Sequence, residues 1–154
     1  MNEFGMGLAP WKRRGEWAEL KFMSAATERG LCVSKPWGET SHYDFVVEGP
    51  RGRLLRVQVK SMSCMWHGGY SVNNSGSQGM YPANAYDFMA AYVIPLDTWF
   101  IIPEEMLRGK RGIQVQHKKG RSKYEKFREA WHLLGGREKA GEEEGELVGN
   151  DGIG

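Results

Sequence analysis

The chain has 154 residues, of which 40% are hydrophobic, and its formal net charge is +2. This length supplies one hydrophobic core and is too short for two ordinary domains. No apolar run approaches the roughly eighteen residues of a membrane span, and the N-terminus lacks a secretory signal, so we expect a cytoplasmic protein with no membrane partner. Cys32 and Cys64 are too few for a disulfide framework.

The charge is unevenly distributed along the chain. Residues 135–154 hold six acidic side chains against Arg137 and Lys139, which leaves a charge of +6 on residues 1–134. Seven basic residues lie close together with almost no acid between them: Arg108, Lys110, Arg111, Lys118, Lys119, Arg121 and Lys123. Such a cluster suits a phosphate backbone, but it is equally compatible with an ordinary solvated surface.

The first predicted element follows a leader, residues 1–11, which we expect to be flexible. Residues 12–29 are good helix formers, and Ala18, Phe22 and Ala25 recur at helical spacing, which predicts an amphipathic helix. Gly30 suits the C-terminal end of that helix. Residues 31–34 then predict a short strand.

A β-hairpin is the strongest structural signal in the chain. Residues 43–48 and 53–61 are rich in β-branched and aromatic residues, and Gly-Pro-Arg-Gly at 49–52 predicts the turn between them. A turn at these four residues places Glu48 opposite Arg53.

Counting back along this ladder puts Asp44 opposite Val57 and next to Gln58. Gln58 and Lys60 share one face of their strand, because side chains alternate between faces. A carboxylate, an amide and an ammonium group are therefore predicted to converge where the two strands end.

The second half of the chain predicts further strands and one helix. Residues 62–82 read as a long loop, with at most a short strand near Tyr70 and Val72. Strands are predicted at 87–93 and 99–102, followed by a short helix from Pro103 or Glu104 to Leu107.

Ser122–Leu134 predicts a closing amphipathic helix. Its aromatic and aliphatic residues recur at helical spacing, and we favour a core role for them over a base-stacking platform: Tyr124, Phe127, Trp131 and Leu134. We therefore expect one domain over residues 12–134 and an acidic, Gly-rich disordered tail over residues 135–154.

The hairpin residues have the chemistry needed for phosphodiester hydrolysis. A divalent cation held by oxygen ligands can activate water and stabilise the charge on phosphorus. Asp44 and the Gln58 carbonyl oxygen are suitable ligands, and Lys60 can orient the water or stabilise transition-state charge if its surroundings lower its pKa.

The order Tyr43-Asp44, hairpin, Gln58-Val59-Lys60 resembles the bipartite motif of PD-(D/E)XK nucleases. The segment from Arg14 to Glu19 is similar to the leading helix of archaeal Holliday-junction resolvases. RVQVKS at 56–61 is more similar to the bacterial and intron-encoded PD-(D/E)XK homing endonucleases, in which Gln replaces the usual acid.

The resemblance implies a restriction-endonuclease-like α/β core, with a mixed central sheet flanked by helices. It also implies a Mg²⁺- or Mn²⁺-dependent endonuclease that cuts DNA as a homodimer or homotetramer. In this reading Glu19 joins Asp44 and Gln58 at the metal, although Glu16 competes for the helix role, and Lys60 acts on the water. Gln58 keeps open an alternative, a non-catalytic nucleic-acid-binding module with the nuclease fold.

Weaker candidates lie elsewhere. Cys64 and His67 lack the partners that a zinc site needs. Asp87 either adds an acid to the site or only begins a strand. The polar stretch between 73 and 78 has hydrogen-bonding groups suited to DNA. The candidate nucleic-acid contacts are Arg14, Asn73, Asn74, Lys118, Lys119 and Arg121.

Overall fold

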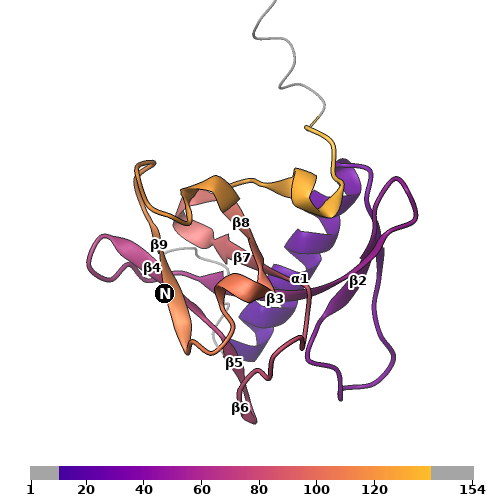
Figure 1. Cartoon of the computed structure of the whole chain (residues 1–154), viewed down its shortest axis with the longest axis horizontal. Coiled ribbons are helices and arrows are strands. Elements are labelled where there is room, and N and C mark those ends of the chain that lie inside the picture. Colours follow the sequence, from indigo (N-terminus) through magenta and orange to yellow (C-terminus); the bar gives the residue numbers. More distant parts are fainter. Residues whose placement is uncertain (1–10, 140–154) are drawn as a thin grey trace, which may run out of the picture.

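A five-stranded mixed sheet forms the centre of the molecule, and the computed structural model describes it within residues 11–139. The strand order is β1-β2-β3-β7-β8, and every neighbouring pair is antiparallel except the parallel pair β3–β7 (Figure 1). The strands of this sheet are β1 Cys32–Ser34, β2 Phe45–Glu48, β3 Leu54–Met62, β7 Phe88–Val93 and β8 Thr98–Pro103. The predicted α/β fold class with a mixed central sheet is confirmed.

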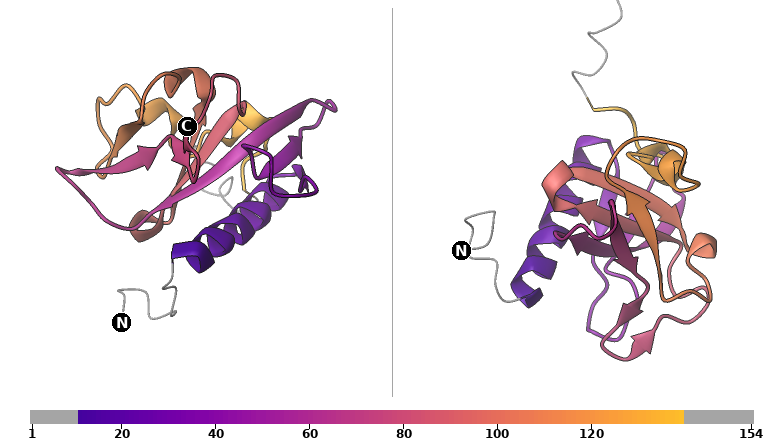
Figure 2. Two further views of the ribbon diagram at one scale, coloured as in Figure 1. Left: turned by 90° about the horizontal axis from the view of Figure 1, so that it is seen from below. Right: turned by 90° about the vertical axis from the view of Figure 1, so that its left-hand side faces the viewer.

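One face of the sheet is covered by the helix α1, Trp11–Glu28, as the left view of Figure 2 shows. Ala18 and Phe22 on this helix are buried in one core cluster with Val57 and Val59 of β3. The helix ends where Gly30 takes a φ of +78°, a conformation that glycine adopts without steric cost. The predicted helix and its stop are therefore confirmed.

The opposite face is covered by strands that stand where the sequence predicts a long loop. Residues 62–82 contain β4 Gly69–Asn73, β5 Ser75–Gly76 and β6 Gly79–Met80. The short strand expected near Tyr70 and Val72 is therefore confirmed as β4, but the prediction that the segment is mainly a loop is wrong. β5 pairs with β6, and β4 pairs with β9, Gly112–Gln116, a strand that was not predicted. Apolar side chains of β4 and β9 pack into a second core cluster with residues from β7 and β8.

The β2–β3 hairpin forms as predicted, but its register differs by one residue. Glu48 pairs with Leu54 rather than Arg53, and Phe45 rather than Asp44 pairs with Val57. The cause is the turn: Gly52 has a φ of +69°, and the Gly49 amide donates to the Arg53 carbonyl at 3.0 Å. This is a three-residue loop closed by a left-handed glycine, which shifts the ladder by one residue.

The closing segment is not the continuous α-helix that was predicted. It forms two 3₁₀ turns, η3 Glu125–Phe127 and η4 Trp131–Leu134, separated by Glu129 with a φ of +50°. The Glu129 carboxylate accepts from the Trp99 amide at 2.7 Å, and this contact with β8 accompanies the break. The predicted core role is nevertheless confirmed, since the four apolar side chains at helical spacing are buried: Tyr124, Phe127, Trp131 and Leu134.

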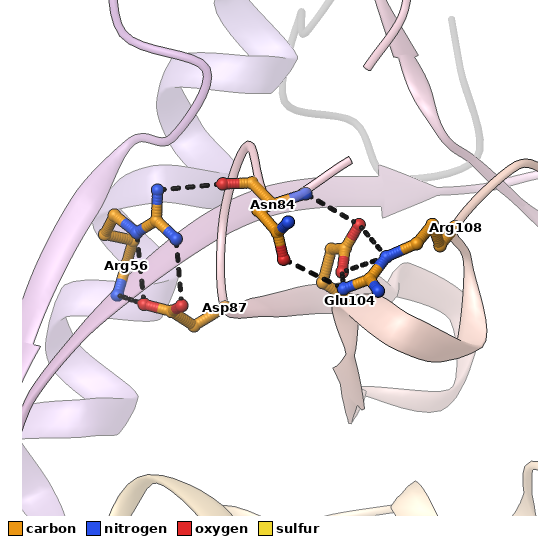
Figure 3. A network of polar contacts seen from close by, with 5 residues as sticks. All are labelled: Arg56, Asn84, Asp87, Glu104 and Arg108. Carbon is orange, nitrogen blue, oxygen red and sulfur yellow. Dashed lines mark hydrogen bonds and ion pairs between the residues drawn. The ribbon is translucent and has the colours of Figure 1, made fainter. Parts of the chain in front are cut away.

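A polar network fixes the segment that leads into β7 (Figure 3). Asp87 forms an ion pair with Arg56 at 3.0 Å and also accepts from the Arg56 backbone amide at 2.7 Å. Arg56 donates to the Asn84 backbone carbonyl, and Arg108 donates to the Asn84 side-chain oxygen. The Asn84 backbone amide in turn donates to the carboxylate of the buried Glu104. The strand-start role of Asp87 is therefore the one that the structure shows.

Two further 3₁₀ turns flank β8, η1 Ile94–Leu96 and η2 Glu104–Met106, close to the predicted turn and short helix. The first residues of the predicted tail pack on the domain, because the Arg137 amide donates to the Arg29 carbonyl at 2.9 Å. Trp11, which was assigned to the flexible leader, is the first residue of α1. Residues 1–10 of the leader and the tail from residue 140 lie outside the described residues. Within residues 11–139, the single α-helix is too polar to cross a membrane.

Candidate active site

Asp44 lies just before β2, at the point where the central hairpin opens. Its backbone amide donates to the Val57 carbonyl at 2.9 Å, and its Oδ2 accepts from the Val59 amide at 2.8 Å. The backbone bond holds Asp44 against β3, and the side-chain bond fixes its carboxylate beside that strand. The position is set by the hairpin itself and needs no distant element.

Gln58 is almost fully buried, at 7% exposure, in the middle of β3. Its Nε2 donates to the Val59 carbonyl at 3.2 Å, which orients the amide because a carbonyl can only accept. Among the described residues no donor reaches Gln58 Oε1. The amide oxygen is therefore left to accept from a ligand.

Lys60 lies two residues further along β3, on the same face as Gln58. Its Nζ donates to the Ser75 carbonyl at 2.8 Å and lies 5.2 Å from the centre of the Tyr81 ring. Burial lowers the pKa of Lys60, while the nearby Asp44 carboxylate acts in the opposite direction. The β5–β6 hairpin thus holds this ammonium group in place.

Glu19 brings a second carboxylate from the middle of α1. Its side chain is half-buried and lines the same cleft as Asp44, and the two carboxylates interact. Glu16 also lines the cleft but is exposed. The electrostatic contact with Asp44 supports Glu19, the residue that the family resemblance implies, over Glu16.

Lys35 is a member of the site that the sequence argument missed. It follows β1 directly, and its Nζ lies 2.6 Å from Glu19 Oε2. Hydrogen bonding to Glu19 raises the pKa of Lys35, with Asp44 and Glu16 adding to the effect. The available signal was its position at the end of a strand paired with β2, the strand that begins beside Asp44.

Two clefts meet at Asp44 and Gln58. The first, of about 550 Å³, lies between α1 and the loop 35–44, and four basic residues line it: Lys12, Arg14, Lys35 and Lys60. The second, of about 630 Å³, lies between that loop and the β5–β6 hairpin. Acidic side chains line the first cleft as well: Glu16, Glu19, Glu39 and Asp44.

The electrostatics of Asp44 are unusual for an aspartate. Burial and the neighbouring Glu19 carboxylate raise the pKa of Asp44 to about 6, against the lowering effect of the Val59 amide and of Lys60. Two neighbouring carboxylates attract a cation strongly, because a bound cation relieves the repulsion between their negative charges.

The donor set fits a hard divalent cation. Within residues 11–139, no group of three or more His, Cys, Asp or Glu side chains is placed to hold a metal ion. Glu19, Asp44 and the Gln58 amide oxygen instead offer two carboxylates and one neutral oxygen. Mg²⁺ is commonly bound by one or two carboxylates, with waters and substrate phosphate completing its shell.

The candidate nucleic-acid contacts fall into three groups. Arg14 lines the first cleft and donates to Ser63 Oγ at 3.0 Å. Asn74 is 2% exposed, and its amide bonds the Leu107 and Lys110 carbonyls and the Tyr86 hydroxyl, so its assignment as a DNA contact is wrong. The third group is exposed but lines neither cleft: Asn73, Lys118, Lys119 and Arg121.

Comparisons with known proteins agree with this architecture. A family model described as PD-(D/E)XK endonuclease matches residues 10–134. Among solved structures, a bacterial homing endonuclease, I-Ssp6803I, is similar with 29% sequence identity and a TM-score of 0.69, over 82% of this chain and 93% of that one. No curated protein sequence matches the chain. The mixed sheet with its leading helix is a restriction-endonuclease-like core, and the chain belongs to the PD-(D/E)XK endonuclease family.

Proposed function

We propose that the protein is a magnesium- or manganese-dependent endonuclease that hydrolyses phosphodiester bonds in DNA. The observation that carries this proposal is the convergence of Glu19, Asp44, Gln58 and Lys60 in one cleft, which meets a second cleft at Asp44 and Gln58. Membership of a nuclease family and likeness to a homing endonuclease support DNA as the substrate.

In this proposal Glu19, Asp44 and the Gln58 amide oxygen hold the cation. When bound, a divalent cation of this kind supplies an acidic water and neutralises charge on the phosphate oxygens. The bond from the Val59 amide orients Asp44 toward the cleft, and the bond to the Val59 carbonyl orients Gln58.

Lys60 has the role of positioning the attacking water and stabilising the developing negative charge. Its contacts with Ser75 and Tyr81 restrict the ammonium group to one region, so little ordering is needed during the reaction. Burial lowers its pKa, which makes the loss of a proton easier than for an exposed lysine.

The test is cleavage of supercoiled plasmid and of a branched DNA junction with Mg²⁺ or Mn²⁺. Wild type is compared with Lys60→Met and Asp44→Asn, and with two exposed control variants, Lys126→Met and Glu105→Gln. The proposal expects metal-dependent nicking that is lost in both site variants and retained in both controls. Salt-sensitive DNA binding without cleavage of any substrate, and without metal binding by calorimetry, would instead establish the alternative, a non-catalytic binding module.

We further propose that the protein acts as a homodimer or homotetramer. Cutting both strands of a duplex takes two active sites, and the described domain holds one set of catalytic candidates. Light scattering coupled to size-exclusion chromatography measures this directly. A monomer that only nicks one strand would contradict the assembly without affecting the catalytic assignment.

A further inference from the structure

Lys35 occupies an unusual place in the cleft, because it binds one of the carboxylates that we assign to the metal. Its Nζ lies 2.6 Å from Glu19 Oε2. Among the salt bridges of the described residues, this is the one that involves Glu19, Asp44 or Lys60. The Lys35 ammonium group and a divalent cation would therefore compete for this carboxylate oxygen.

The two lysines of the cleft differ in their freedom to move. Lys60 is mostly buried and is held by a backbone carbonyl and an aromatic ring. The Lys35 side chain is 62% exposed. Glu19 is its single ion-pair partner among residues 11–139, and its Nζ also lies 5.5 Å from the centre of the Phe45 ring. Its four-carbon stem can swing within the cleft without disturbing the core.

The surroundings of Lys35 show where the released ammonium group would go. Lys12 and Arg14 on α1 line the same cleft as Lys35 and the two carboxylates. A phosphate bound in this cleft would therefore be within reach of several cations, Lys35 among them. Lysine contacts phosphate as a mobile point charge, which suits a residue that exchanges partners.

We propose that Lys35 is an exchangeable cation of the active site. It neutralises Glu19 in the free enzyme and moves to a phosphate oxygen of the nucleic acid when Glu19 binds the divalent cation. This inference rests on the proposed metal-dependent nuclease function. It adds a substrate-positioning residue outside the Asp44, Gln58 and Lys60 motif.

The test uses the full chain with Lys35→Met, which removes the charge but keeps a long apolar stem. Lys35→Arg retains the charge. Lys12→Met is the matched control, because Lys12 lines the same cleft but forms no ion pair within the described residues. The first measurement is the affinity for Mn²⁺ alone, by calorimetry or electron paramagnetic resonance, which does not depend on activity.

Lys35→Met should bind Mn²⁺ roughly three- to tenfold more tightly than wild type, because it removes a competing ion pair. Lys35→Arg should stay close to wild type, and Lys12→Met should change affinity by less than about twofold. At saturating Mn²⁺, single-turnover cleavage by Lys35→Met should nevertheless fall. The proposal therefore expects affinity and rate to change in opposite directions.

Different results overturn different parts of the scheme. Unchanged or weaker Mn²⁺ binding by Lys35→Met, with wild type binding the ion, refutes the exchange and leaves the nuclease proposal intact. Tighter binding with an unchanged rate at saturating Mn²⁺ refutes the phosphate contact, and with it the proposal. If neither wild type nor Lys35→Met binds Mn²⁺, the metal-dependent function fails as well.

Discussion

Asp44→Asn should stabilise the fold at the same time as it abolishes cleavage. The pKa of Asp44 rises from 3.8 to about 6 in the folded protein, so the ionised side chain opposes folding. A rise of about two units corresponds to about 3 kcal/mol at a pH above both values. That pKa already includes the favourable Val59 amide bond, which an asparagine oxygen can still accept, so we expect a gain of about 2 to 3 kcal/mol.

The sign of this effect depends on pH in a defined way. A raised pKa means that protonation favours folding. The free energy of unfolding of wild type therefore falls as the pH rises from about 4 to about 6, and this contribution stays constant at higher pH. The advantage of Asp44→Asn should therefore be full at pH 8 and shrink to below about 1 kcal/mol at pH 4.5. Urea unfolding in EDTA at the two pH values measures both numbers.

Glu105→Gln is the matched control, because Glu105 is an exposed acid on η2, away from both clefts. It should change the free energy of unfolding by less than about 0.5 kcal/mol at either pH. A loss of stability in Asp44→Asn at pH 8, or the same gain at both pH values, would refute the electrostatic argument for this site.

Three further predictions concern other parts of the molecule. Asn74→Ala should destabilise the fold by about 2 to 3 kcal/mol in urea unfolding, because it removes a side-chain donor from the Leu107 and Lys110 carbonyls and leaves the buried Tyr86 hydroxyl without its acceptor. Replacing Lys118, Lys119 and Arg121 together by alanine should weaken DNA binding and reduce the salt slope by up to about three, with circular dichroism unchanged; an unaltered slope would remove this surface from the interface. Gln58→Glu should tighten Mn²⁺ binding in calorimetry while lowering stability in EDTA, since it adds a charge at a position that is 7% exposed.

The parts of the fold that local sequence controls were predictable. The leading helix and the β2–β3 hairpin depend on nearby residues, and three of the four catalytic candidates lie on that hairpin or beside it. Glu19 needed the family resemblance as well, because helical periodicity alone does not decide between two acids three residues apart.

The parts that depend on distant contacts were not predictable. β4 finds its partner β9 some forty residues later in the chain, and neither strand has a strong pattern of its own. The closing segment has helical periodicity, but Glu129 bonds to β8 and interrupts the helix. Lys35 could be placed beside Glu19 only once the packing of α1 on the sheet was known.

The connection between β3 and β7 has a consequence for how specificity can diversify. These parallel strands are joined by β4 and the β5–β6 hairpin rather than by the helix that commonly connects parallel strands. The β5–β6 hairpin forms one wall of the second cleft, while Asp44 and Gln58 belong to the central hairpin. Changes in the length or sequence of that wall can therefore alter which substrate is accepted without moving the residues that perform the chemistry.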